Sequence, residues 1–260
     1  MFKNCGFEII DAHIHPFIEP ENNLRFYSIP DTMDEMVAGL KQNGVSRACG
    51  SVIKGAEIKD FEYIKKVNRD ALKLRDMYQG FIIPGMSVHA AFTEESCREV
   101  EEMYKTHGVR WLGELVSYMC GTAEYSCSSL FPIYDLAQEL DMPVNIHQHV
   151  LTDIEKILVN FPKLKIVMAH PDEKSVYTKR VELMRKYENL HLDISGTGIF
   201  RWGTLKWGVD QVGSERFLFG SDYPICSVGQ YVQGVLSEPL TDTDRAAIFS
   251  GNFKRLAKIR

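Results

Sequence analysis

Residues 143–170, PVNIHQHVLTDIEKILVNFPKLKIVMAH, contain one copy of the pattern that decides the fold. The apolar runs 143–147 and 165–170 predict two strands, and residues 152–162 between them carry apolar side chains at helical spacing. A helix that joins two strands indicates a parallel pair, because parallel strands need a crossover connection. This stretch therefore favours an α/β fold.

The same alternation extends over the whole chain of 260 residues. Eight apolar runs are predicted as strands: FEII (7–10), VSRACGSVI (45–53), GFIIPGM (80–86), VRWLGELV (109–116), PVNIH (143–147), KIVMAH (165–170), LHLDIS (190–195) and RFLFGSD (216–222). Helices are expected over residues 31–44, 60–77, 93–108, 131–142, 152–162, 174–187, 203–213 and 241–259. These repeats predict a (β/α)8 TIM barrel, with residues 1–260 forming a single catalytic domain. A doubly wound open sheet is the alternative, but its first turn is usually rich in glycine, unlike this one.

The composition argues against several classes of partner. The formal net charge is −5 and the 30 Lys and Arg residues are scattered, so neither nucleic acid nor an anionic membrane is expected to bind. No apolar run approaches the roughly 20 residues needed to cross a bilayer, and residues 1–15 lack the pattern of a signal peptide, so we expect a cytoplasmic protein. The six cysteines form no CxxC pair and predict free thiols, although Cys120 and Cys127 could pair near a loop.

Polar residues stand at the ends of the predicted strands, where a TIM barrel carries its chemistry. They are Asp11, His13 and His15 after the first strand, Glu114, His147 and His170 on the fourth, fifth and sixth, Asp193 and Ser195 on the seventh, and Asp222 on the eighth. Side chains alternate along a strand, so residues 11, 13 and 15 share one face. Closure of the barrel then brings Asp222 beside His13 and His15.

A divalent metal site explains this distribution. An isolated HxH pair is more commonly a core or loop feature than a metal site. Here, however, residue types that bind metals recur at the ends of the first, fourth, fifth, sixth and eighth strands. We expect zinc, as one or two ions, with manganese as the alternative.

Five motifs carry a resemblance to a known family: DAHIH (11–15), NIHQH (145–149), MAHPDE (168–173), NLHLDISG (189–196) and LFGSDYP (218–224). By these motifs the chain resembles the amidohydrolase superfamily, in the amidohydrolase-related (amidohydrolase-2) branch. This branch includes aminocarboxymuconate-semialdehyde decarboxylase-like enzymes and metal-dependent lactonases. The resemblance implies that the first metal is bound by His13, His15, His147 and Asp222. It also implies that His170 binds a second metal or orients the substrate, and homodimers are common in the family.

The chain departs from the family at two places. Many binuclear members carry on strand four a lysine that becomes carbamylated and bridges two metals, whereas this chain has Glu114 in LGELVSY. Glu114 could bridge two ions, bind one ion or only accept hydrogen bonds, so the number of ions stays open. His170 is followed by Pro171 and Asp172 instead of the Gly-Gly of many relatives.

The other candidates lie in loops. His149 is expected just beyond its strand, in a supporting rather than a ligand role. Lys54, Tyr118 and Arg201 fall in predicted mouth loops and are candidate substrate-binding residues, with Arg201 suited to a carboxylate. Each of them is also explained as a solvated or packing residue. His89, His107 and His191 are expected at the surface or at strand starts.

The predicted function is hydrolysis of a C–O or C–N bond in a small lactone, ester or amide. A bound metal would lower the pKa of a water to roughly 7, Asp222 would move protons, and His170 would polarise the attacked carbonyl. The alternative is a non-oxidative decarboxylase or hydratase acting on a small unsaturated or aromatic carboxylate. A non-catalytic metal-binding barrel is disfavoured because no principal ligand is missing. A phosphoesterase of another metal-dependent barrel family is disfavoured because residues 16–30 offer no further histidine ligands.

Overall fold

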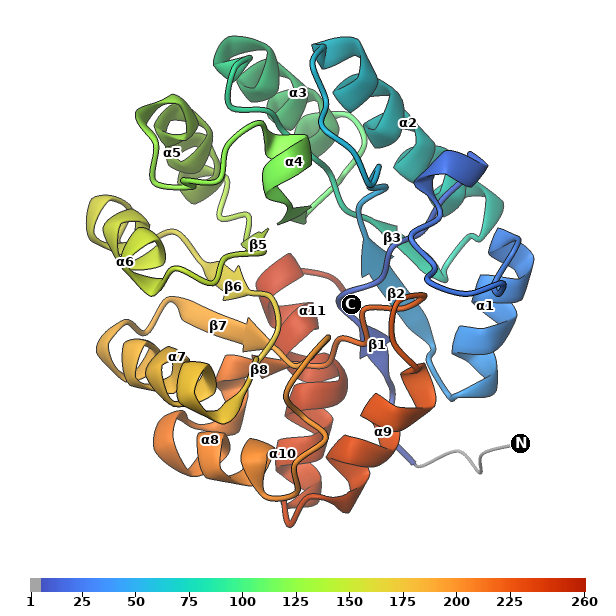
Figure 1. Ribbon diagram of the computed structural model, residues 1–260, viewed down its shortest axis with the longest axis vertical. Helices are drawn as coiled ribbons and strands as arrows, with labels where there is room; N and C mark the ends of the chain where they lie inside the picture. Colours follow the sequence, from blue (N-terminus) through green and yellow to red (C-terminus); the bar gives the residue numbers. More distant parts are fainter. Residues whose placement is uncertain (1–5) are drawn as a thin grey trace.

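Eight parallel strands form the centre of the molecule, and helices surround them (Figure 1). The computed structural model describes residues 6–260. The strands are β1 (Ile10–Asp11), β2 (Arg47–Gly50), β3 (Ile82–Pro84), β4 (Leu112–Leu115), β5 (Val144–Ile146), β6 (Ile166–Met168), β7 (Leu190–Asp193) and β8 (Phe217–Leu218). They pair in chain order within two groups, β1-β2-β3 and β4-β5-β6-β7-β8.

Hydrogen bonds and bridges close these two groups into a barrel. Met86 faces Leu112 in a parallel bridge between the segments of β3 and β4, and Ile14 faces Tyr223 just beyond β1 and β8. At the second junction the amide of His15 donates to the carbonyl oxygen of Tyr223 at 2.9 Å. The predicted (β/α)8 barrel is therefore confirmed, and its first and last strands are neighbours.

The helices follow the strands in alternation and are longer than them. They are α1 (Met33–Gln42), α2 (Phe61–Met77), α3 (Thr93–Lys105), α4 (Ser117–Cys120), α5 (Phe131–Glu139), α6 (Leu151–Asn160), α7 (Lys174–Lys186), α8 (Thr204–Val212), α9 (Val228–Ser237), α10 (Asp242–Ala246) and α11 (Asn252–Ala257). Two of them, α4 and α9, were not predicted. Two glycines weaken the helical signal of α9, but Val228, Tyr231, Val232 and Val235 form a buried stripe that stabilises it.

Two further boundaries differ from the prediction. The predicted final helix, 241–259, is interrupted by the π-helical turn Ala247–Gly251 between α10 and α11. The strands are shorter than the apolar runs that predicted them, and most of the runs continue as buried chain beyond the paired residues. Asp11, Glu114 and Asp193 lie in β1, β4 and β7, and the other polar strand-end residues stand on the connecting segments just beyond their strands, at the barrel mouth.

An apolar floor closes the opposite end of the barrel. The helix α11 packs Phe253, Leu256 and Ala257 against inward-facing strand residues, and the rings of Phe253 and Trp111 lie 5.0 Å apart. Figure 1 shows α11 behind the strands, near the barrel axis. Because this end is filled, the carboxyl ends of the strands form the open mouth.

Several predictions outside the mouth can be compared with the structure. Five described cysteines, among them Cys120 and Cys127, are free thiols, and Cys5 lies outside the described residues. His191 lies at the start of β7, as expected, and is buried there. His89 is buried rather than exposed, and its Nε2 lies 3.0 Å from the carbonyl oxygen of Ile58. Within residues 6–260, no helix combines the length and the apolar character needed to span a membrane.

Candidate metal centre

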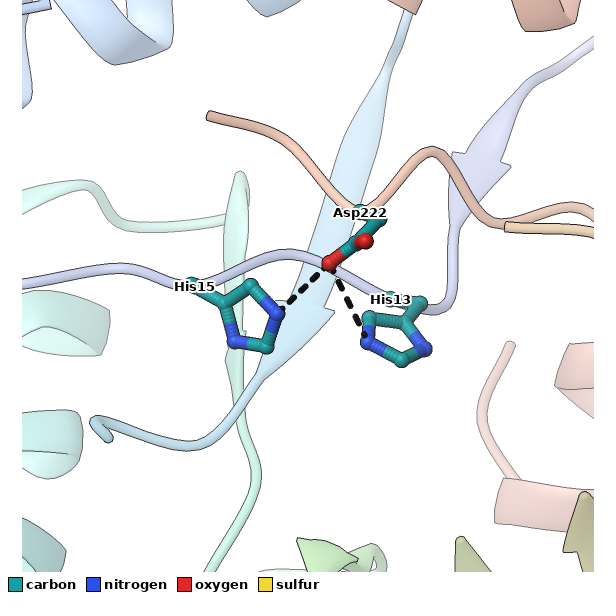
Figure 2. A group of neighbouring side chains, drawn as sticks. All are labelled: His13, His15 and Asp222. Carbon is teal, nitrogen blue, oxygen red and sulfur yellow. Dashed lines mark hydrogen bonds and ion pairs between the residues drawn. The ribbon is translucent and has the colours of Figure 1, made fainter. Parts of the chain in front are cut away.

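The segments after β1 and β8 bring His13, His15 and Asp222 together (Figure 2). The Nε2 atom of His15 lies 2.8 Å from Oδ1 of Asp222, and Nε2 of His13 lies 3.7 Å from the same oxygen. All three residues are buried, and Asp222 has a φ of 64°. A left-handed backbone is costly for a non-glycine residue, so the surrounding fold must hold Asp222 in this orientation.

Glu114, His147 and His170 form a second trio on the neighbouring side of the mouth. Oε1 of Glu114 lies 2.7 Å from Nδ1 of His147, and this nitrogen lies 3.3 Å from Nε2 of His170. The other carboxylate oxygen, Oε2, lies 3.3 Å from Nε2 of His13. Glu114 therefore links the two trios.

Every residue of the two trios except His13 borders one cavity of about 150 Å³. Its lining is His15, Leu24, Glu114, Val116, Ser117, Tyr118, His147, His170, Asp222 and Ile225. Side chains from the first, fourth, fifth, sixth and eighth strand segments thus meet in one place, although more than 200 residues separate the outermost of them. The cavity has a polar base and a partly apolar wall.

The donor atoms fit a divalent cation. Within each trio, one ligand atom per residue lies within 4.8 Å of the others. The Nε2 of His13 is buried without a hydrogen-bond partner among residues 6–260, while its Nδ1 lies 3.0 Å from Oδ2 of Asp193. With a proton on Nδ1 toward Asp193, His13 would offer the lone pair of Nε2 to a cation, beside the carboxylates of Glu114 and Asp222. A cation between these groups would give that orphaned nitrogen a partner.

The charges of the centre also favour a cation. Burial lowers the pKa of His13, but the charges of Glu114 and Asp193 outweigh it and raise the pKa well above its ordinary value. Burial raises the pKa of Glu114, yet His13 and His147 bring it well below its usual range. The pKa of His170 is lowered, first by burial, which keeps the imidazole neutral and able to offer a lone pair. Positive charge is therefore stabilised among the carboxylates.

The end of β7 orients two of these histidines. The carboxylate of Asp193 contacts Nδ1 of His13 and accepts a hydrogen bond from the amide of Ser195 at 3.1 Å. The hydroxyl of Ser195 lies 3.0 Å from Nδ1 of His170. Gly196 has a φ of 62°, and a Cβ there would lie 2.3 Å from Nδ1 of His170. Only glycine therefore leaves room for this imidazole.

Asp11 holds the backbone of the mouth together. Its carboxylate accepts hydrogen bonds from the amide of His13 at 3.1 Å and from the hydroxyl of Ser221 at 2.5 Å. Burial raises the pKa of Asp11 to about 7, against the hydrogen bonds from Ser221 and His13, which lower it. Asp11 thus ties the segment after β1 to the segment after β8, so that His13 and Asp222 meet.

A second hydrogen-bonded chain runs outward from His147 to the rim. Nε2 of His147 lies 3.2 Å from Nε2 of His149, and Nδ1 of His149 lies 3.0 Å from Oδ2 of Asp172. A guanidinium nitrogen of Arg180 donates to the same oxygen at 2.5 Å. From sequence, Asp172 was noted only as a departure from the family pattern, and Arg180 was not singled out. The only available signal was the unusual aspartate two residues after His170.

The three candidate substrate-binding residues lie in different places. Tyr118, on α4, lines the metal cavity. The ammonium group of Lys54 lies 4.6 Å from the ring centre of Tyr63. Arg201 pairs with Glu173 at 2.6 Å and lines a separate cavity of about 540 Å³. Lys54 and Arg201 are therefore outside the described lining of the metal cavity.

Comparison with known proteins gives one family match. The model of the amidohydrolase family matches residues 10–256, which is nearly the whole chain. No curated protein sequence matches the chain significantly.

Solved structures share the fold over the whole chain at low sequence identity. The 5-carboxyvanillate decarboxylase from Sphingomonas paucimobilis has a TM-score of 0.79 and 15% identity, with 98% of this chain and 100% of that chain covered. The 2,6-dihydroxybenzoate decarboxylase from Rhizobium has a TM-score of 0.76 and 15% identity, with coverages of 97% and 99%. A dihydroxybenzoic acid decarboxylase from a Polaromonas species, solved with manganese and 2-nitroresorcinol, has a TM-score of 0.73, 17% identity and coverages of 97% and 97%.

Proposed function

The chain belongs to the amidohydrolase family of enzymes, and from this membership we propose that it catalyses the metal-dependent, non-oxidative decarboxylation of a small aromatic or unsaturated carboxylate. The convergence of three imidazoles and two carboxylates on one mouth cavity, with Nε2 of His13 3.3 Å from Glu114 and 3.7 Å from Asp222, carries the proposal. Fold relatives that decarboxylate aromatic acids support it. From sequence alone we placed hydrolysis first, and the comparisons favour the alternative.

We assign the cation to His13, His15, His147 and Asp222, with Glu114 and His170 beside it. Imidazole and carboxylate donors accept both zinc and manganese, and the Polaromonas relative holds manganese. When bound, such a cation supplies a Lewis acid that draws in a carboxylate or hydroxyl oxygen of the substrate and withdraws electron density from it. The number of ions depends on whether Glu114 serves as a ligand.

Asp222 is the proposed proton carrier. In decarboxylation the bond between the carboxyl carbon and the substrate breaks, carbon dioxide leaves, and the electron pair stays on the substrate carbon. That carbon then takes one proton. The carboxyl group of Asp222 borders the cavity and is held by His15 at 2.8 Å, so it can deliver this proton and be protonated again from solvent.

His170 and the cavity wall would orient the substrate. If Nδ1 of His170 donates to the Ser195 hydroxyl, which lies 3.0 Å away, Nε2 carries a lone pair toward the cavity. That lone pair can accept a hydrogen bond from a substrate hydroxyl or bind the cation, but cannot polarise a carbonyl as the sequence analysis proposed. Leu24, Val116 and Ile225 supply apolar surface for a small flat ring.

Hydrolysis of a neutral lactone, ester or amide is the second candidate. Glu114 and Asp222 both border the cavity, so an anionic substrate enters against two carboxylates unless the cation offsets them. A neutral substrate avoids this repulsion. The same residues would then act on a water and a leaving group.

A screen that measures two products separately tests both candidates. Protein loaded with zinc or manganese is mixed with hydroxybenzoates and unsaturated acids while carbon dioxide is measured, and with lactones, esters and amides while acid release is measured. We expect carbon dioxide and one equivalent of the decarboxylated product, and loss of both in Asp222→Asn. Acid release without carbon dioxide would replace the proposal by hydrolysis, and no turnover of either panel would count against both.

A further inference from the structure

We propose that His149 and Asp172 are positioning residues that fix the tautomer of His147, so that Nδ1 of His147 offers a lone pair to the cation. The proposal rests on the assignment of His147 as a ligand in the proposed function. Neither His149 nor Asp172 borders the metal cavity, so their action on the site passes through His147.

The chain of contacts is continuous from the cavity to the rim. Nδ1 of His147 faces the cavity, 2.7 Å from Glu114 and 3.3 Å from His170. The opposite nitrogen, Nε2, lies 3.2 Å from Nε2 of His149, and the two rings are nearly perpendicular, at 77°. Nδ1 of His149 then lies 3.0 Å from Asp172. Each imidazole thus uses both of its nitrogens.

The carboxylate at the outer end determines where each proton lies. An ionised carboxylate only accepts hydrogen bonds, so Nδ1 of His149 must carry a proton and donate it to Asp172. In a neutral imidazole the other nitrogen is then an acceptor, so Nε2 of His149 accepts from Nε2–H of His147. Nε2 of His147 therefore keeps its proton, and Nδ1 would offer a lone pair once a cation displaces the proton that Nδ1 donates to Glu114, at 2.7 Å, in the metal-free protein. That nitrogen is the one that faces Glu114 and the cavity.

Asp172 is itself held in place from two sides. Arg180 on α7 is fully buried and donates to Asp172 at 2.5 Å, while its Nε and Nη1 have no partner among the described residues. The amide of Asp172 donates to the carbonyl oxygen of Thr197 at 2.8 Å. The buried guanidinium therefore has Asp172 as its acidic partner, and the carboxylate has a fixed position from which to direct His149.

The closing experiment is made on His149, because loss of Asp172 would leave the buried charge of Arg180 unpaired and could unfold the protein. In His149→Phe the acceptor for Nε2–H of His147 is removed. In His149→Gln an amide oxygen can take its place. His107→Phe is the matched control, since the partly exposed His107 lies beside Glu102, between α3 and β4, on the amino side of β4 rather than at the carboxyl end that forms the mouth.

Two measurements are made without substrate. The first is the dissociation constant for zinc and for manganese, by competition with a chromophoric chelator. Loss of a group that orients a ligand typically weakens metal binding by about 10- to 100-fold. We expect this weakening in His149→Phe, partial recovery in His149→Gln and no change in His107→Phe. The second is nitrogen-15 NMR of the imidazoles in the zinc-loaded protein, in which His147 should carry its proton on Nε2 and bind through Nδ1, and should become a mixture of tautomers in His149→Phe.

Unchanged metal affinity together with an unchanged His147 tautomer in His149→Phe would overturn the inference. Equal losses of metal affinity in His149→Phe and His149→Gln would also overturn it, because they would show that His149 acts by filling space and not by accepting a hydrogen bond. Both measurements are independent of catalysis. If no substrate is decarboxylated but the affinities and tautomers change as expected, the proposed function fails and the positioning role stands.

Discussion

Two histidines of the centre, His13 and His147, are oriented by carboxylates in different surroundings. His13 contacts Asp193 directly at 3.0 Å, and both side chains are 1% exposed. His147 reaches Asp172 only through His149, and the side chains of His147 and His149 are 36% and 56% exposed. Water can replace a lost partner at the rim but not inside the barrel. We call His13 and Asp193 the buried half of the centre, and His147, His149 and Asp172 the rim half. The buried half should therefore control both stability and metal binding, whereas the rim half should control mainly metal binding.

The largest expected effect comes from Asp193→Ala, which removes the buried carboxylate. It leaves Nδ1 of His13, the side-chain amide of Asn145 and the amide of Ser195 without their acceptor. Removing one partner of a buried pair costs about 3–5 kcal/mol, so we expect a loss of that size in the free energy of unfolding, measured in urea. Metal binding should be lost as well. If Asp193→Ala and His149→Phe had the same free energy of unfolding, the buried half and the rim half would not differ in their contribution to stability.

The cation itself provides the next test, because it joins the two halves. At a free concentration 100 times its dissociation constant, a ligand adds about 2.7 kcal/mol to the free energy of unfolding. We expect zinc or manganese to raise the melting temperature accordingly, and a chelator to reverse the increase. At the same metal concentration, a variant whose affinity is tenfold weaker should lose about 1.4 kcal/mol of that stabilisation. No metal-dependent shift in the unaltered protein would contradict the assignment of the centre.

Gly196→Ala perturbs the buried half without removing a polar group. The added Cβ would lie 2.3 Å from Nδ1 of His170, on a backbone with a φ of 62°. We expect a loss of about 1–3 kcal/mol in stability from the strained backbone, and a loss of turnover because the imidazole must move. Gly108→Ala is the matched control: its φ is 71°, but nothing lies within 4 Å of the added Cβ. A similar loss of turnover in both variants would mean that the position of His170 is not what matters.

The same contrast explains how much the sequence could predict. His13, His15 and Asp222 meet because strand order and closure of the barrel bring them together, and both follow from the periodicity of the apolar runs. The contact between His149 and Asp172 depends on two loops, and Asp172 has a φ of 64° that no local pattern announced. Periodicity says nothing about such loop conformations.

The long side chains were the hardest to place from sequence. Lys54 and Arg201 were expected near a substrate because their loops were expected at the mouth. The structure gives each a nearer partner, the ring of Tyr63 for Lys54 and the carboxylate of Glu173 for Arg201. Flexible cationic side chains find such partners only after the chain has folded, so their sequence positions alone carry little information about a site.

The smallest expected effect separates the cavity wall from the outer loops. Tyr118 lines the cavity. Tyr118→Phe removes the hydroxyl and with it at most one neutral hydrogen bond to a substrate, which contributes about 0.5–1.5 kcal/mol to binding. We expect KM to rise up to about tenfold with little change in kcat. Arg201→Ala should leave both constants within about twofold, since its exposed ion pair with Glu173 contributes little. A larger change in KM from Arg201→Ala than from Tyr118→Phe would indicate that the substrate extends from the metal cavity toward the outer cavity lined by Arg201. The functional site would then be wider than the metal centre.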